Sequence, residues 1–463
     1  MLSRRELIGL GAAAGLASGC APLAARLRHK APLDAFALPA GPTEPAVRLF
    51  GRAGFGHRPG DLQAYAADGH EKTVERLLHA DAPEDPTLIA QISRLEAFRM
   101  NADEMEDLHR EEVVRQLQQG AFLRSVYGAN PLKERMVDFW TNHFNIYGPK
   151  ETCAWRKGSD EDHVIRENAL GSFPKMLEMS ARSPAMLAYL DNERNVSGHA
   201  NENYARELME LHTLGVDGGY TQRDIQEVAR CFTGWMVEER FLRRKGTFRF
   251  DPDRHDNGRK MVLGHVIPAG GGEADAQTVL AIVSRHPSTA KFLAKKLSLY
   301  FLGERHPRVE GEVAEAYGKT GGDIRAMLRP ILFSPALLEG SPILKRPLDL
   351  VASALRALDA STDGSRPIQE HLNAMGQAAC QWPMPDGYPV KPTAWSGSML
   401  PRWNFAFALA EGRIRGTTLE RADLSKSVQV EALLGKKPDA ELLQAVERDG
   451  LGVALASPEF QWR

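Results

Sequence analysis

Apolar side chains recur at intervals of three and four residues along most of this chain of 463 residues. This spacing gathers them on one face of an α-helix, so it predicts amphipathic helices that bury a common core. We expect helices at 61–78, 101–126, 131–147, 183–190, 201–214, 221–235, 288–302, 322–333, 347–358 and 424–434. The predicted fold is therefore mainly α, a large multi-helix body.

Two segments depart from the helical period. Residues 247–250 alternate with a period of two, residues 260–263 form a short β-type run, and Asn257-Gly258 lies between them. An Asn-Gly pair between two such runs is a hairpin signal, which predicts one small β-hairpin over 246–264. Residues 380–403 are rich in Pro, Gly and Trp, which predicts a long irregular loop.

The N-terminus resembles an export signal. Arg4 and Arg5 precede a run of small and apolar residues at 9–19, a pattern similar to twin-arginine signal peptides. The run is far shorter than the ~20 residues needed to span a bilayer. Small residues directly before Cys20 resemble a lipoprotein cleavage site, so we expect lipidation of Cys20. Ordinary cleavage within 21–25 is the alternative.

This signal sets the expected domain organisation. Residues 1–20 are the signal, 21–45 a tether rich in Ala, Pro and Leu, and 46–463 a single helical body. We expect export by the twin-arginine route to the periplasm, or attachment to the cell envelope through the lipid. The net charge of −2 gives no support to nucleic-acid binding. With 43% hydrophobic and 25% charged residues, the composition excludes a disordered chain and a coiled-coil rod.

Residue spacings exclude several common kinds of site. Cys153, Cys231 and Cys380 are scattered and no Cys-x-x-Cys occurs, which excludes a zinc ribbon. His-Glu-x-x-His, Gly-x-Ser-x-Gly and the Gly-rich phosphate loops are also absent, which argues against a zincin helix, an α/β-hydrolase and a nucleotide fold. We expect these three cysteines to be small buried apolar side chains.

The densest group of polar residues lies in the helix expected at 201–214. Asn203, Glu207 and Glu210 fall within about 60° of one another on a helical wheel. Glu207 and Glu210 are therefore candidate ligands of a divalent metal ion or a general acid and base, with Asn203 binding substrate. Arg206 is expected to bind an anionic group or to orient a glutamate. The alternative is a solvated helix face on which Arg206 pairs with Glu202 and Glu210.

Two histidines are candidate metal ligands elsewhere. His143 shares a helical stripe with the apolar Met136 and Trp140, where a buried imidazole ligates a metal or simply donates a hydrogen bond to a backbone carbonyl. His255 and Asp256 lie side by side in the expected turn, where both side chains can face one cation. The alternative is that Asp256 only shapes the turn.

Several of these segments together resemble a large bacterial family catalogued as domain of unknown function number 1800. The matching segments are 49–56, 136–144, 184–191, 201–235, 255–264, 286–290, 345–347, 385–395 and 457–460. Gly54 and Cys231-Phe232 depart from the family pattern. The resemblance implies a predominantly helical and commonly exported protein, without an established reaction. It also implies a partner, an exported protein similar to alkaline phosphatases and sulfatases.

Two functions remain open at this stage. The first is an exported hydrolase that depends on a metal or on carboxylates and acts on an envelope or extracellular substrate. Its shell would be His143, Glu207, Glu210, His255 and Asp256, and a carboxylate-only glycosidase is a variant that needs two groups ~5–9 Å apart across a cleft. The second is a non-catalytic helical lipoprotein that binds a protein or polymer. Aromatic side chains of the 380–403 loop, such as Trp395, would then contact the ligand, unless they anchor the loop to the core.

Overall fold

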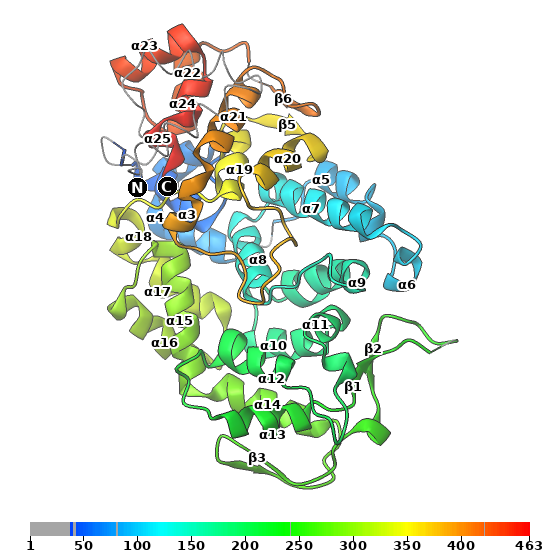
Figure 1. Ribbon diagram of the computed structural model, residues 1–463. Coiled ribbons are helices and arrows are strands. Elements are labelled where there is room, and N and C mark those ends of the chain that lie inside the picture. Colours follow the sequence, from blue (N-terminus) through cyan, green and yellow to red (C-terminus); the bar gives the residue numbers. More distant parts are fainter. Residues whose placement is uncertain (1–37, 40–42, 80–81, 241, 421) are drawn as a thin grey trace, which may run out of the picture.

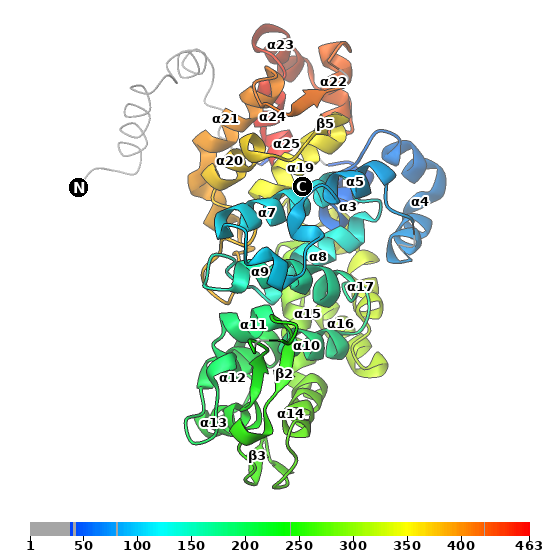
Figure 2. The same cartoon turned by 90° about the vertical axis from the view of Figure 1, so that its right-hand side faces the viewer.

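The computed structural model describes residues 38–39, 43–79, 82–240, 242–420 and 422–463. Helices dominate these residues, and the only strands among them form three small two-stranded sheets, so the mainly α prediction is confirmed. The molecule is elongated, with helices α22–α25 at one end and the hairpin of β3 at the other (Figures 1 and 2). The predicted signal and nearly all of the predicted tether lie outside the described residues.

The helices follow one another with short connections. In the first half they are α3 (Pro45–Ala53), α4 (Asp61–Leu78), α5 (Pro86–Ile92), η2 (Glu96–Phe98), α6 (Ala102–Met105), α7 (Arg110–Tyr127), α8 (Pro131–His143), α9 (Cys153–Ser159), η3 (Asp160–Arg166), α10 (Phe173–Arg182), α11 (Pro184–Tyr189), η4 (Asn192–Arg194), α12 (Glu202–Glu207), η5 (Leu208–Thr213) and α13 (Gln222–Cys231). In the second half they are η6 (Pro252–Arg254), α14 (Ala274–Arg285), α15 (Pro287–Leu302), α16 (Pro307–Thr320), α17 (Ile324–Leu332), α18 (Pro335–Glu339), α19 (Pro347–Ala357), α20 (Arg366–Ala374), η7 (Pro392–Ser398), α21 (Met399–Ala410), α22 (Lys426–Leu434), α23 (Ala440–Asp449), α24 (Gly452–Ala456) and α25 (Pro458–Gln461).

Proline begins many of these helices, including α8, α11, α15 and α19. A first-turn residue needs no backbone N–H for the helix, so proline costs nothing there. One predicted helix is broken. The capping box at Asn101 is present, but the helix it begins, α6, ends at Met105 and a separate helix, α7, follows. Between them the backbone carbonyl of Leu108 accepts a hydrogen bond from the Trp155 indole at 3.1 Å.

The β structure forms where it was predicted but pairs differently. Strand β1 (Trp235–Val237) pairs antiparallel with β2 (Phe248–Phe250), and β3 (Lys260–Val262) pairs antiparallel with β4 (His265–Ile267). The tight turn is therefore Leu263-Gly264, both with positive φ, rather than Asn257-Gly258. Two hairpins thus replace the single one expected over 246–264. A third pair joins β5 (Ala360–Thr362) to β6 (Thr417–Leu419).

Within the described residues, no helix is long and apolar enough to cross a membrane. The predicted irregular loop is present from 380 to 391, but residues from 392 onward are helical, in η7 and α21. Cys153, Cys231 and Cys380 are free and buried, as expected, and burial raises the pKa of each thiol to about 12. Such thiols are unreactive, so these cysteines are structural.

Helix α8 lies at the centre of the molecule and is fixed by a buried ion network (Figure 1). The carboxylate of Asp349, on α19, accepts hydrogen bonds from Arg135 of α8 at 2.6 Å and from Arg346 at 3.1 Å. The guanidinium group of Arg463, the C-terminal residue, lies 3.4 Å from the same carboxylate. Four charged side chains, each at most 4% exposed, therefore join α8, α19 and the C-terminus.

The charge of Asp349 is stabilised only by the three arginines together. Burial alone would raise the pKa of Asp349, but the three guanidinium groups outweigh burial and hold that pKa well below its ordinary range. The carboxylate is therefore ionised in the folded protein. A buried charge with several opposite partners is stabilised only while all of them remain.

Replacing Asp349 with alanine should destabilise the fold strongly, because it leaves three buried guanidinium groups without their carboxylate. We expect the free energy of unfolding, measured by urea denaturation, to fall by about 3–5 kcal/mol. The matched control is Glu312→Ala, which removes an exposed ion pair with Arg308 and should change stability by less than ~1 kcal/mol. Similar small losses in both variants would contradict the role of the network.

Candidate functional site

The acidic stripe of α12 and η5 forms the ion-pair ladder that was the alternative interpretation. Arg206 lies 3.1 Å from Glu202 and 3.4 Å from Glu210, and it also donates to the side-chain oxygen of Gln222 at 3.0 Å. The Arg206 side chain is 37% exposed, so these pairs lie near solvent. The guanidinium group is thus occupied by neighbouring side chains.

Glu207 differs from its neighbours. Its side chain is partly buried and makes no hydrogen bond or ion pair with the described residues. Burial raises its pKa, and the negative charges of Glu210 and Asp386 raise it further, while Arg206 opposes them. Asp386 belongs to the 380–391 loop, so this loop approaches the acidic stripe.

The two predicted substrate-binding residues have structural partners. The Asn203 amide donates hydrogen bonds to the carbonyl of Leu190 at 3.2 Å and to the Asp191 carboxylate at 3.3 Å. The Trp395 indole is buried and donates to the carbonyl of Pro389 at 3.1 Å. Trp395 therefore anchors its loop to the core, and its ring is not available on the surface.

The predicted metal shell does not form. His255 lies 2.8 Å from the carbonyl of Thr233 and 3.1 Å from the Asp275 carboxylate, whereas Asp256 pairs with Arg230 at 2.8 Å and 3.1 Å. Hydrogen bonding to this arginine lowers the pKa of Asp256 to about 2. The side chains of His255 and Asp256 thus have different partners. Asp256 also accepts a hydrogen bond from the backbone N–H of Gly258, which stabilises the loop.

The other predicted metal ligands are also not placed around a common metal ion. Among the described residues, no three His, Cys, Asp or Glu side chains are placed to hold one metal ion. His143, His255, Glu207 and Glu210 are therefore not placed around one metal ion. The adjacency of His255 and Asp256 in sequence was misleading because their side chains point to separate elements, α14 and α13.

His143 is buried in a cluster of its own. Its Nδ1 accepts a hydrogen bond from Lys296 of α15 at 2.9 Å, and its Nε2 donates to the backbone carbonyl of His212 at 3.0 Å. Burial, then the nearby charge of Lys296, holds the pKa of His143 well below its ordinary range, and the same causes lower that of His212 to about 3. Both imidazoles are therefore neutral at neutral pH.

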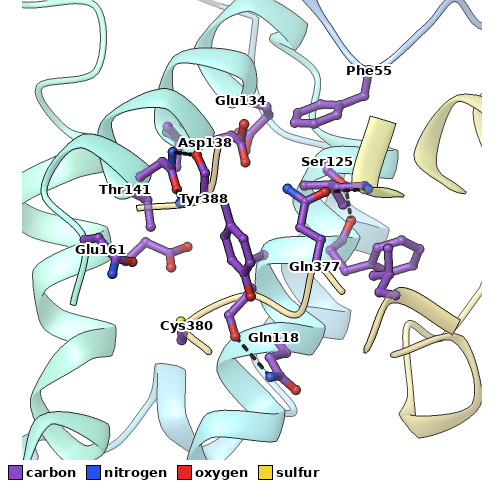
Figure 3. A pocket seen from close by; sticks show the side chains of 18 of the residues that line it. Phe55, Gln118, Ser125, Glu134, Asp138, Thr141, Glu161, Gln377, Cys380 and Tyr388 are labelled. Atoms are coloured by element: carbon purple, nitrogen blue, oxygen red, sulfur yellow. Dashed lines mark hydrogen bonds between the residues drawn. The ribbon is translucent and has the colours of Figure 1, made fainter. Parts of the chain in front are cut away.

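A pocket of about 90 Å³ lies beside α8 (Figure 3), and His143 is not among the residues that line it. Its walls come from α7, α8 and η3 and from two segments much further along the chain, α20 and residues 377–388. Apolar walls are supplied by Phe55, Phe122, Val137, Leu348 and Leu372. A concave site with apolar walls and a few polar groups is typical of ligand-binding pockets.

Three carboxyl groups line this cavity in different electrostatic settings. Glu134 forms a bidentate pair with Arg166 at 2.5 Å and 3.0 Å. Oδ2 of Asp138 accepts hydrogen bonds from Arg346 at 2.6 Å and from the hydroxyl of Tyr300. Both carboxyl groups thus have close hydrogen-bond donors.

Glu161 has no such partner. Its side chain is buried, and its nearest cation is Arg124 at 3.5 Å, a long contact. Burial raises the pKa of Glu161, and the charges of Arg124, Lys157 and Arg166 only partly oppose this effect. Figure 3 shows its carboxyl group extending from η3 into the space next to the ring of Tyr388. A carboxyl group with this setting can hold a proton at higher pH than an ordinary glutamate.

Neutral polar groups close the cavity. The Asn142 amide accepts from the backbone N–H of Tyr388 at 2.6 Å and donates to its carbonyl at 2.8 Å, so α8 holds the 380–391 loop in place. The Tyr388 hydroxyl donates to the carbonyl of Ala378 at 2.7 Å. The hydroxyl of Thr141 is buried without a partner among the described residues, which leaves it free to bond to a ligand or water.

The sequence contains a pattern of polar residues that indicates this cavity. The sequence prediction followed the apolar stripe around His143 instead. Glu134, Asp138 and Thr141 are spaced i, i+4 and i+7 and form a second stripe on α8, and Asn145 follows shortly after the helix ends. All four line the cavity. Glu161 carried no comparable signal, because its segment is crowded with charges and its π-helical backbone changes which residues share a face.

Comparison with models of protein families shows the family of this chain. A model described as "Protein of unknown function (DUF1800)" matches residues 48–462. The chain belongs to this family. No curated protein and no solved structure matches it. In this DUF1800 chain the matched region contains every residue that lines the cavity.

The stability of the DUF1800 chain should fall as the pH is lowered from 7 to 5. His212 stays neutral in the folded state but takes up a proton near pH 6.5 when unfolded, so acid favours unfolding. Each such histidine should contribute about 1.4 kcal/mol per pH unit below pH 6.5. In urea denaturation His212→Gln should flatten the pH dependence by this amount, whereas the exposed control His199→Gln should leave it unchanged. Equal slopes in all three proteins would contradict this assignment.

Proposed function

We propose that the cavity beside α8 is the active site of a hydrolase that uses carboxyl groups as acid and base. The observation that carries this proposal is the contrast between Glu161, which is buried with only a long 3.5 Å contact to Arg124, and Asp138, whose Oδ2 accepts hydrogen bonds from Arg346 and Tyr300. Two carboxyl groups that line one pocket in unlike surroundings are typical of acid–base catalysis.

The two groups have distinct roles in the proposed reaction. Both hydrogen bonds that Asp138 accepts from described residues reach Oδ2, so Oδ1 is available to orient a water molecule and take its proton. The Glu161 carboxyl group delivers its proton to the leaving group as the bond to the substrate breaks. Exchange of one proton with solvent restores both groups for the next turnover.

The position of these groups supports hydrolysis better than the α12 stripe does. Glu207 and Glu210 are one turn apart on the same helical segment and project in similar directions. Asp138 and Glu161 come from different helices, α8 and η3, and line the same pocket. Groups on separate elements can flank a bond from two sides, as carboxylate hydrolases require. The small volume and apolar walls favour a small substrate with an apolar part.

Glu161→Gln should remove the general acid with little change in shape. We expect kcat to fall by about 10²- to 10⁴-fold, and Asp138→Asn to have an effect of similar size. The measurement is turnover of a panel of small chromogenic esters, glycosides and phosphate esters by the purified chain. The control is Glu167→Gln, whose side chain is exposed on the same segment. Full activity of Glu161→Gln, or no turnover of any class by the unaltered protein, would contradict the proposal.

A second proposal rests on the 380–391 loop. We propose that, if the cavity does not catalyse, the chain is a lipoprotein that binds a protein partner, such as an exported phosphatase- or sulfatase-like protein. Met384 in this loop is 56% exposed, which is unusual for a large apolar side chain and favours a contact surface. Loss of partner capture from membranes in Met384→Ser, with turnover unaffected, would support it.

We also propose that residues 1–20 direct export by the twin-arginine route and that Cys20 carries a lipid anchor. The support is the sequence alone, because this segment lies outside the described residues. A periplasmic or envelope site of action agrees with a hydrolase for envelope or extracellular substrates.

Substitution of Arg4 and Arg5 by lysine should block export while keeping the charge, because this pathway recognises the arginine pair rather than net charge. The measurement is the distribution of the full chain between cytoplasmic, periplasmic and membrane fractions. Cys20→Ala serves as the matched variant and should release exported protein from the membrane. Unchanged fractionation of the lysine variant would contradict twin-arginine export.

A further inference from the structure

The loop between β1 and β2 projects from the helical body. Strand β1 ends at Val237 and β2 begins at Phe248, and the connecting chain extends away from the neighbouring helices (Figure 1). Leu242 in this loop is 88% exposed, more than any other large apolar side chain in the described ranges. Its side chain therefore contributes nothing to the hydrophobic core.

The backbone of Leu242 is also unfavourable. Its φ is +68°, in the left-handed region that a residue with a Cβ atom seldom adopts. A residue that neither packs nor suits its backbone does not stabilise the fold. Strained and exposed positions in loops are typical of binding segments. The apolar side chain at this position thus points to a function in binding.

Two unpaired arginines follow this leucine. Arg243 and Arg244 are exposed, and neither forms an ion pair with a carboxylate of the described residues. A guanidinium group presents its N–H donors in a planar fork, which matches the oxygen atoms of a phosphate group. The tip of the loop therefore combines an apolar side chain with two unpaired cations.

The nearby acidic residues are close to other cations of the loop. Glu238 accepts hydrogen bonds from Arg240 at 2.6 Å and 2.9 Å. Asp103 and Glu106 lie 3.8 Å and 4.0 Å from Nζ of Lys245, which are long contacts. The positive charge at the tip is therefore not cancelled locally.

A second pocket, of about 280 Å³, lies beside the base of the loop. Its lining includes the cations Arg99, Arg156, Arg244 and Lys245 and, among the described residues, one carboxylate, Asp162. An arginine of α7 pairs with that carboxylate at 2.8 Å, and Arg156 is paired with two glutamates. Arg99 is exposed and has no carboxylate partner in the described part of the chain. Arg99 and Arg244 thus give the pocket an unbalanced positive charge, and its volume is large enough for a phosphate group.

The apolar and cationic groups together distinguish a membrane from other anionic partners. A nucleic acid or an acidic polysaccharide would use the arginines but leave Leu242 in water. At the surface of a phospholipid bilayer, arginines reach the phosphates while a neighbouring apolar side chain enters the acyl region. The combination therefore favours an anionic phospholipid surface.

We propose that this loop and the adjoining pocket bind the surface of an anionic phospholipid membrane. Leu242 enters the acyl region, and Arg243 binds lipid phosphates at the surface. Arg99 and Arg244 hold one headgroup in the pocket. The contact holds the folded body against the membrane at residues far along the chain from Cys20. It requires neither the proposed hydrolysis nor the proposed lipid anchor.

The test places a spin label at the tip of the loop. The full chain with Cys20→Ala and Leu242→Cys is labelled with an apolar nitroxide reagent, while Cys153, Cys231 and Cys380 are buried and stay unlabelled. Electron paramagnetic resonance then measures how often the label collides with oxygen, which concentrates in the acyl region. We expect the collision rate to rise severalfold with vesicles of an equal mixture of phosphatidylcholine and phosphatidylglycerol. Vesicles of phosphatidylcholine alone should leave it unchanged.

The matched control carries the label at Val216, which is 71% exposed in another loop, and its collision rate should stay constant with both kinds of vesicle. A label at residue 242 that stays in water with the mixed vesicles would overturn the proposal. Equal insertion into phosphatidylcholine alone would overturn the requirement for anionic lipid. Heparin serves as a soluble acidic polymer. Slower motion of the label with heparin, without insertion into vesicles, would assign the loop to a polymer instead.

Substitutions test the cations of the tip. Arg243→Gln combined with Arg244→Gln should weaken binding to the mixed vesicles, measured by co-sedimentation, by about 10- to 30-fold. The control is Arg223→Gln combined with Arg259→Gln, which removes the same charge from two exposed arginines outside the loop and should change binding by less than ~3-fold. Equal losses would show an effect of net charge alone and would overturn the site. All variants carry Cys20→Ala and share the segment before it, so the comparison does not depend on a lipid anchor.

The pocket is tested separately. Arg99→Gln should weaken binding to the mixed vesicles by about fivefold, because it removes one cation from the headgroup. The control is Arg94→Gln, an exposed arginine nearby in sequence, which should change binding by less than ~2-fold. Equal effects of the two substitutions would overturn the role of the pocket in headgroup binding.

Discussion

The buried carboxylate of Asp349 is the constraint on which the functional arrangement depends. A carboxylate in the core must meet cations or it destabilises the fold. Arg135, Arg346 and Arg463 supply them, and Arg346 also reaches Asp138 on α8. The ion network therefore fixes how α8 is turned about its own axis, and the rotation of α8 decides which of its side chains enter each neighbouring space.

Fixed in this way, α8 turns one face toward the apolar core and another toward the cavity. On one face Trp140 and His143 are buried in the apolar core, and His143 receives Lys296. On the other face Glu134, Asp138 and Thr141 line the cavity. The Asn142 amide links both to the 380–391 loop through its two hydrogen bonds with Tyr388. The proposed hydrolytic site thus depends on α8 and on the loop that Asn142 holds against this helix.

Local surroundings then give similar side chains different chemistry. Glu134 and Glu161 line one cavity. Glu134 forms an ion pair with Arg166, whereas burial raises the pKa of Glu161. On α15, Lys295 is exposed to solvent, whereas Lys296 is partly buried and donates a hydrogen bond to the imidazole of His143. Such differences arise because the free energy of a charge depends on burial and on partners within a few ångströms.

The sequence by itself determined the helical class, most helix starts and the family segment, because these follow from short-range patterns such as prolines, caps and apolar spacing. It also indicated the β-rich segment, although the Leu263-Gly264 turn, rather than Asn257-Gly258, forms the tight hairpin. The candidate site was decided only by tertiary structure. Asp138 and Arg346 are far apart along the chain, and so are His143 and Lys296, yet each pair is in contact. Sequence spacing on one helix brought Glu207 to notice, but it could not show that Glu161 and Lys296 lose their solvent, because burial is a property of the packed chain.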